Sequence, residues 1–86
     1  MEKQVARFNK NATEEVIVKL VDYKGLDLID IRSYVKPLTS DEELKATRKG
    51  ICLKVEHIPE LRKALKEAEK VSREIKDLRS AKPNQN

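Results

Sequence analysis

Two stretches on either side of Lys24-Gly25 constrain the fold of this chain most. Residues 14–23, E-E-V-I-V-K-L-V-D-Y, and residues 26–35, L-D-L-I-D-I-R-S-Y-V, are rich in β-branched and aromatic side chains. This composition favours β-strands. Between them, Lys24-Gly25 can form a tight two-residue turn, because glycine adopts positive φ at no steric cost. The sequence therefore predicts an antiparallel hairpin, around which the other elements must be arranged.

The two faces of this hairpin differ in chemistry. Because side chains alternate along a strand, Lys19 and Tyr23 share one face of the first strand, and Arg32 and Tyr34 share one face of the second. Single-stranded nucleic acid exposes base faces that stack on aromatic rings and phosphates that pair with cations. The pattern also has an ordinary structural explanation, since strand-end tyrosines pack at core edges and Arg32 can pair with Asp30.

Two further strands are predicted from shorter stretches. Residues 4–9 suffice for a short edge strand, and residues 48–55, R-K-G-I-C-L-K-V, indicate a main strand. In the latter, Cys52 lacks an activating neighbour and is expected to be a small buried hydrophobic residue. The connection before this strand ends at Thr47 and has two interpretations: a helical turn capped by Ser40 and Glu43, or an acidic loop.

A long helix is predicted over residues 58–79. Pro59 suits the first helical position, no glycine or proline follows until Pro83, and apolar residues recur every three or four positions. Such a stripe is too long to be buried on one small sheet, so a second copy of the chain is expected to cover it. The expected dimer-interface residues are Leu61, Leu65, Ala68 and Ile75. Residues 80–86 are polar and are expected to form a disordered tail.

Size and composition limit the classes of function. The chain has 86 residues, of which 38% are hydrophobic and 40% charged, so one domain with a thin core is expected over residues 1–79. The net charge of +4 suits a polyanionic partner. Cys52 and His57 are the single residues of their types, and no nucleophile with a base, Gly-rich phosphate loop or metal-ligand spacing is present. We therefore expect no catalysis, cofactor or metal.

The sequence shows no secretory leader and no apolar run long enough to span a membrane. A location in the cytoplasm, associated with the nucleoid, is expected, or in the nucleus if the source is a eukaryote.

Three short strings, taken in order and followed by the helix, carry a family resemblance. They are D-Y-K-G at 22–25, L-I-D-I-R at 28–32 and R-K-G-I-C-L at 48–53. Together they resemble the conserved domain of the positive cofactor four family of transcriptional coactivators, whose bacterial members are small single-strand DNA-binding proteins; the resemblance covers residues 5–75. It implies an α+β fold, in which a four-stranded curved antiparallel sheet is followed by one long C-terminal helix. It also implies a homodimer formed through the helices, in which each sheet presents a channel for single-stranded nucleic acid.

The resemblance also implies which residues line that channel. It assigns Tyr23, Lys24, Arg32, Arg48 and Lys49 to the channel. Lys19 and Tyr34, which lie on the same strand faces, complete the predicted nucleic-acid-binding set. Two positions depart from the family pattern, because Val35 stands where a Trp is usual and Leu26 where a Lys is common. One stacking platform and one cation are thus absent.

The sequence predicts a non-catalytic, sequence-tolerant single-stranded DNA-binding protein that acts in transcription, replication or repair. One alternative of a different class is a protein-interaction module that uses the long helix and the acidic loop at Asp41, Glu42 and Glu43. A second alternative keeps the binding face but has single-stranded RNA or unwound duplex as the ligand.

Overall fold

The computed structural model describes residues 1–39 and 41–80, and these form two compact units. The sheet unit is Met1–Glu56, and the helical unit begins at His57. The expectation of one domain over residues 1–79 stays a prediction.

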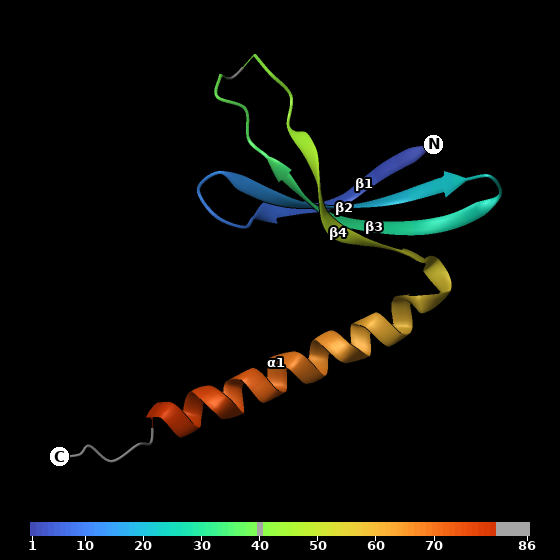
Figure 1. Ribbon diagram of the computed structural model, residues 1–86. Coiled ribbons are helices and arrows are strands. Elements are labelled where there is room, and N and C mark those ends of the chain that lie inside the picture. The colour runs from blue at the N-terminus through green and yellow to red at the C-terminus, as the bar shows by residue number, and fades with distance from the viewer. Residues whose placement is uncertain (40, 81–86) are drawn as a thin grey trace. The chain divides into compact units, whose positions relative to one another are not determined.

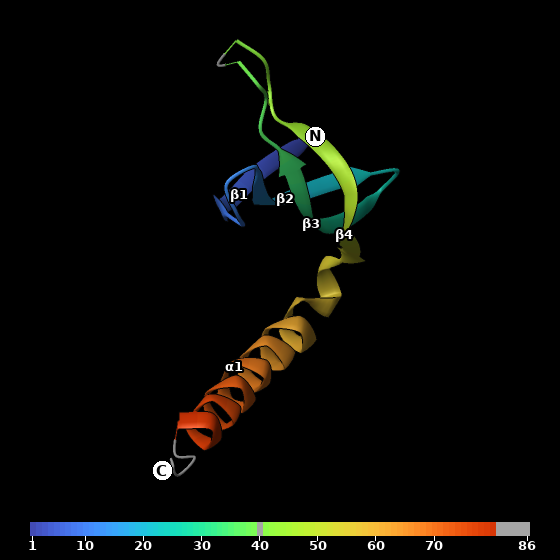
Figure 2. The ribbon, with the colours of Figure 1, turned by 60° about the vertical axis from the view of Figure 1, so that its left-hand side comes forward.

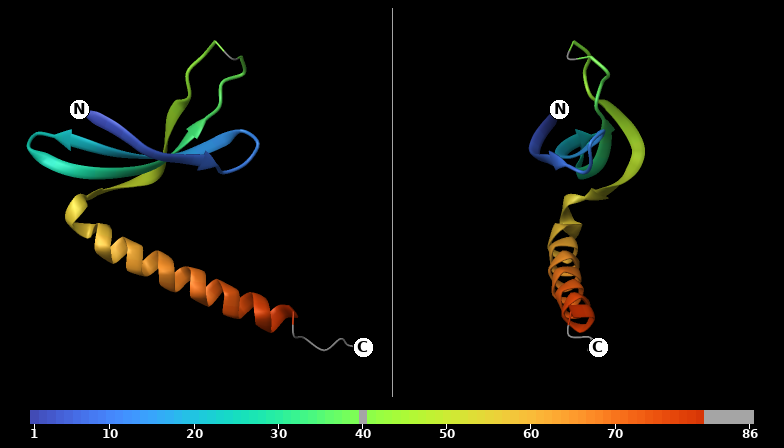
Figure 3. Two further views of the ribbon diagram at one scale, coloured as in Figure 1. Left: turned by 180° about the vertical axis from the view of Figure 1, so that it is seen from behind. Right: turned by 90° about the vertical axis from the view of Figure 1, so that its left-hand side faces the viewer.

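The sheet unit is a four-stranded antiparallel sheet in the order β1-β2-β3-β4. The strands are β1 (Glu2–Asn9), β2 (Glu14–Tyr23), β3 (Leu26–Val35) and β4 (Lys45–Lys54). The sheet is open and strongly curved, as Figure 1 and Figure 3 show. Together with the helix that follows in the chain, this confirms the predicted fold class.

The central hairpin of β2 and β3 has an uninterrupted register. Its pairs run from Glu14 opposite Val35 to Tyr23 opposite Leu26. The turn residue Lys24 has φ of 50° and Gly25 has φ of 80°. Two positive φ values in succession are the geometry of a type I′ turn, whose twist matches that of paired strands. The turn predicted from the sequence is therefore present.

The outer strand β4 begins three residues earlier than predicted, at Lys45 instead of residue 48. Its register with β3 shifts between Arg32 and Tyr34, so that pairing resumes with Tyr34 opposite Ala46. At the shift the backbones lie close together, because a Cβ added to Gly50 would come within 2.5 Å of the Ile31 carbonyl oxygen. Because the register shift interrupts regular alternation, the alternation pattern of the sequence does not predict where β4 begins.

The connection between β3 and β4 was predicted as a capped helical turn or an acidic loop. Ser40 lies outside the described residues. Near it, the Glu42 amide donates a hydrogen bond of 3.3 Å to the Thr39 carbonyl. The described residues of this connection contain a turn and no helix.

The sheet has two chemically distinct faces. Residues paired across antiparallel strands project to the same side, so the pairs assign each residue to a face. The apolar face, as we define it, comprises Phe8, Val16, Val18, Leu20, Ile29, Ile31, Ile51 and Leu53. The basic face comprises Lys19, Tyr23, Arg32, Tyr34, Arg48 and Lys54, with the residues paired to them. The core is thin, since the buried hydrophobic residues among those described are Ile17, Ile29 and Tyr34.

Cys52 is exposed, so the expectation of a buried cysteine is wrong. It pairs with Asp30 and therefore projects to the basic face, away from Ile51 and Leu53 on the apolar face. Alternation on β4 decides its environment more than its hydrophobic neighbours in sequence do.

The helical unit contains α1 (Ile58–Ser80), preceded by one 3-10 turn at Val55–His57. Figure 2 shows α1 as one continuous helix. The predicted helix, 58–79, ends one residue earlier. The rest of the predicted tail, 81–86, lies outside the described residues. Within residues 1–39 and 41–80, no helix is long and apolar enough to cross a membrane.

Candidate nucleic-acid interface

The basic face gathers six of the seven predicted binding residues. Lys19, Tyr23, Arg32 and Tyr34 belong to cross-strand pairs on one side of β2 and β3, and Lys24 lies in the turn that joins these strands. Arg48 lies in the stretch of β4 where the register with β3 shifts. We infer that it projects to the basic face, because its neighbour Lys49 reaches Glu14 on the other side and adjacent residues of a strand project to opposite sides. The hairpin and β4 thus bring together residues far apart in the chain.

Several cations of this face are already paired with carboxylates. Lys19 Nζ lies 3.0 Å from Glu2 Oε1. Arg7 also projects to this side, because it pairs with Ile17, which pairs with Arg32, and its Nε lies 2.6 Å from Glu15 Oε1. Contact with Tyr34, followed by the hydrogen bond to Glu2, raises the pKa of Lys19. These cations therefore add little net positive charge at the surface of the face.

Arg32 is held in place by its neighbours. Its Nη2 lies 2.8 Å from Asp30 Oδ1, its Nε donates to both Asp30 oxygens, and its Nη1 donates to the Thr47 carbonyl at 3.1 Å. The hydrogen bond to Asp30 raises the pKa of Arg32. The local ion pair considered from the sequence is therefore formed. Arg32 is fixed on the face, and much of its charge is balanced there.

The unbalanced charge of the basic face comes from Lys24, Arg48 and Lys54. Within residues 1–39 and 41–80 none of the three forms an ion pair. Lys54 pairs with Leu28 and so projects to the basic face near the hairpin turn. Sequence reasoning did not include Lys54 in the site. The alternation that groups it with Cys52 was the signal that would have found it.

The two tyrosines differ in how far they are available to a ligand. Tyr34 is 9% exposed, with Lys19 Nζ at 5.1 Å from its ring centroid. Tyr23 is 56% exposed, and Lys24 Nζ lies 5.3 Å from its ring centroid. Only an exposed ring offers a surface on which a base can stack. Of the two rings, Tyr23 is exposed enough for a base to stack on it, whereas Tyr34 is buried.

Lys49 is not brought together with the other six predicted residues. Its Nζ lies 3.7 Å from Glu14 Oε1, and Glu14 pairs with Val35 on the side of the apolar face. The pKa of Glu14 is lowered, chiefly by the hydrogen bond from the Ser33 hydroxyl. Neighbours in sequence, Arg48 and Lys49 thus serve opposite sides of the sheet.

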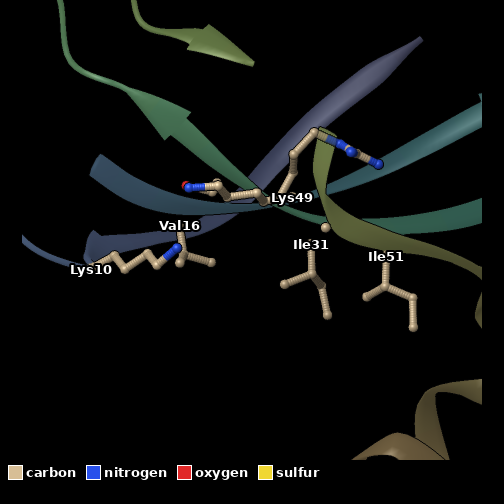
Figure 4. Close-up of a pocket in the computed structure, with 8 residues that line it drawn as sticks. Lys10, Val16, Ile31, Lys49 and Ile51 are labelled. Carbon is tan, nitrogen blue, oxygen red and sulfur yellow. The ribbon is translucent and has the colours of Figure 1, made fainter. Parts of the chain in front are cut away.

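A shallow hollow of about 310 Å³ lies on the apolar side, next to Lys49. Val16, Ile31 and Ile51 project into it from three strands, with Lys10 and Lys49 at its border, as Figure 4 shows. The two lysines at its border form ion pairs with the same carboxylate, since Lys10 Nζ lies 3.6 Å and Lys49 Nζ 3.7 Å from Glu14 Oε1. In the part of the chain that the structure describes, no group of three or more His, Cys, Asp or Glu residues is placed to hold a metal ion.

Comparison with solved structures supports the same architecture. A PC4 homologue from Burkholderia pseudomallei matches in its tetragonal crystal form with a TM-score of 0.71 and 25% identity, covering 80% of this chain and 98% of that chain. Its orthorhombic form matches with a TM-score of 0.69 and 27% identity, covering 78% and 88%. A bacteriophage T5 homologue of the eukaryotic transcription coactivator PC4, implicated in recombination-dependent DNA replication, matches with a TM-score of 0.58. At 20% identity, over 91% of this chain and 96% of that chain, it supports the fold alone.

No protein with a curated description matches the sequence. A family model described as Transcriptional Coactivator p15 (PC4), however, matches residues 10–64, which is more than half of the chain. The matched region contains the central hairpin, β4 and the start of α1. This chain belongs to the PC4 family of transcriptional coactivators, as the resemblance of its sequence motifs predicted.

Proposed function

We propose that this chain binds single-stranded DNA through the basic face, with little sequence preference and without catalysis, in transcription, replication or repair. The observation that carries the proposal is the combination, on one side of the sheet, of an exposed ring and cations that form no ion pair within residues 1–39 and 41–80. These residues are Tyr23, Lys24, Arg48 and Lys54. Membership of the PC4 family supports a role at nucleic acid.

The chemistry of this face favours a single strand over a duplex. Stacking on Tyr23 requires the flat side of a base, which a duplex hides between neighbouring base pairs. Lysines act as point charges toward phosphates, whereas the guanidinium of Arg48 can donate two parallel hydrogen bonds to phosphate oxygens. None of these contacts distinguishes one base from another, so binding is expected to tolerate sequence.

We further propose that the protein acts as a homodimer that forms through α1. The apolar stripe of this helix is exposed, with Leu65 at 60% and Ile75 at 44% of their full accessible surface. Burying such side chains against a second copy removes apolar surface from water, which stabilises the dimer by about 25 cal/mol per Å² of buried apolar surface. The proposed interface is the predicted one: Leu61, Leu65, Ala68 and Ile75.

The test of the binding proposal is fluorescence anisotropy with a labelled 20-nucleotide DNA strand, its matching duplex and an RNA strand of the same sequence. Each titration is repeated over a series of salt concentrations. We expect the single DNA strand to bind more tightly than the duplex, with affinity that falls linearly on a log-log salt plot. Equal or tighter binding of the duplex, or no binding at low salt, would overturn the proposal. Tighter binding of RNA would identify RNA as the ligand.

Two triple variants of equal charge test the face that binds. One replaces Lys24, Arg48 and Lys54 by Ala, and the other replaces lysines that project to the other side of the sheet: Lys3, Lys45 and Lys49. Both lower the formal net charge from +4 to +1. Only the first is expected to abolish binding to the single strand. Equal losses in both variants would mean that net charge, and not the basic face, governs binding.

A further inference from the structure

The tip of the central hairpin presents an exposed apolar pair on the basic face. Tyr23 and Leu26 are the last cross-strand partners before the turn. Directly opposed side chains have Cβ atoms about 5 Å apart, so the ring and the isobutyl group stand side by side. Tyr23 is 56% exposed and Leu26 is 44% exposed. Together they form an apolar surface that water still reaches.

Cations flank this surface at two places. Lys24 Nζ lies 5.3 Å from the centroid of the Tyr23 ring. Lys54 is opposite Leu28, which is two residues from Leu26 and on the same side of β3. Neither lysine forms an ion pair within residues 1–39 and 41–80. An apolar patch next to unbalanced positive charge suits a ligand that is flat and apolar in one part and anionic in the next.

We propose that the Leu26 side chain packs against the nucleobase that stacks on Tyr23, and that Lys54 binds the phosphate next to that base on the β4 side. The base stacks on the ring and also packs against the Leu26 side chain. Leu26 is thereby assigned as a binding residue, although it is uncharged. The inference rests on the proposed function and specifies how one nucleotide is held.

A binding role of Leu26 differs from a purely structural one in its effect on two probes, because an aromatic–aliphatic pair also stabilises a hairpin. The two probes are 20-nucleotide DNA strands with the same phosphates. One is oligothymidylate, and the other is an abasic strand with tetrahydrofuran in place of every nucleoside. A residue that contacts a base affects binding of the first probe only. A residue that contacts phosphate, or that merely maintains the fold, affects both.

Anisotropy titrations of both probes are made with the wild type and with Leu26→Ala, Leu26→Met and Lys24→Ala. Leu26→Ala is expected to weaken binding of oligothymidylate by roughly fivefold and to leave the abasic strand unchanged. Leu26→Met, which keeps apolar bulk, is expected to restore most of the loss. Lys24→Ala is expected to weaken both probes. The matched control is Leu20→Ala, a residue 38% exposed that projects to the other side of the sheet and is expected to change neither.

Each outcome decides between the claims. If the wild type does not bind oligothymidylate, the proposed function fails. If the wild type binds and Leu26→Ala binds both probes as the wild type does, only the present inference fails. An equal loss for both probes in Leu26→Ala also overturns it, because the residue would then act through the fold.

A second measurement observes the stacked ring directly. The chain has two tyrosines and no tryptophan, so Tyr34→Phe leaves Tyr23 as the single strong emitter. Stacking of a base on the ring is expected to quench its fluorescence on addition of oligothymidylate, with no quenching by the abasic strand. Adding Leu26→Ala to this background is expected to reduce the quenching at saturation. Full quenching without Leu26 would show that the ring alone holds the base.

Discussion

Arg48 and Lys49 are adjacent cations for which the structure gives opposite expectations. Arg48 projects to the basic face and forms no ion pair within residues 1–39 and 41–80, whereas Lys49 lies 3.7 Å from Glu14 on the other side. Replacing either by Ala removes one positive charge, from +4 to +3. The two variants therefore share the effect of net charge and differ only in the face that they alter.

The expected size of the effect follows from one lost phosphate contact. Two unit charges 4 Å apart in water interact by about 1 kcal/mol, which corresponds to about fivefold in affinity. Each phosphate neutralised on a single strand contributes about 0.7 to the slope of log affinity against log salt. Arg48→Ala is therefore expected to bind about fivefold more weakly, with a slope smaller by about 0.7. Lys49→Ala is expected to stay within about twofold, since salt screens charges beyond about 10 Å.

The assay is anisotropy with a labelled 20-nucleotide DNA strand at four or more salt concentrations. Circular dichroism of both variants checks that the sheet and helix are retained. A loss in Lys49→Ala as large as that in Arg48→Ala would refute the assignment of faces. So would an unchanged slope in Arg48→Ala.

Three further predictions concern assembly and stability. Leu65→Glu and Ile75→Glu place a charge in the apolar stripe of α1 and are expected to lower the dimer mass seen by sedimentation. The lowered pKa of Glu14 contributes stability above its ordinary value of 4.5, and this stability is lost as pH falls through the lowered pKa. Glu14→Gln is therefore expected to melt at a lower temperature than the wild type at pH 7 and together with it at about pH 2. Gly50→Ala forces a Cβ against the Ile31 carbonyl and is expected to cost about 1–3 kcal/mol in chemical denaturation.

Each of these has a result that would contradict it. A dimer mass retained by both helix variants would mean that α1 does not form the interface. A melting difference between Glu14→Gln and wild type that stays constant with pH would show that titration of this carboxylate does not contribute. An unaltered denaturation midpoint in Gly50→Ala would mean that the strands can separate at the register shift without cost.

The hairpin and the helix were predictable because local pattern and final environment agree there. Regular alternation in residues 14–35, with glycine in the turn, specifies both the strands and the side to which each residue projects. The stripe in α1 likewise follows from helical periodicity alone. In these elements no distant contact overrides the local signal.

The details of β4 were not predictable in the same way. The register shift near Gly50 depends on close packing of two backbones, which composition does not reveal. Interpreting Arg48-Lys49 as one basic unit ignored alternation, and Lys54 was omitted although alternation would have included it. The balance of charge on Arg32 depends on the side-chain geometry of Asp30 and Thr47, which becomes visible only in the folded chain.

Photo-crosslinking shows directly whether a single DNA strand lies on the basic face. The strand carries 5-bromodeoxyuridine at every thymidine, and crosslinked tryptic peptides are identified by mass spectrometry. Tyr23 and Phe8 are matched reporters, because they are 56% and 58% exposed and project to opposite sides of the sheet. Binding on the basic face predicts crosslinks at Tyr23 and none at Phe8. Crosslinks at Phe8 without Tyr23 would contradict it.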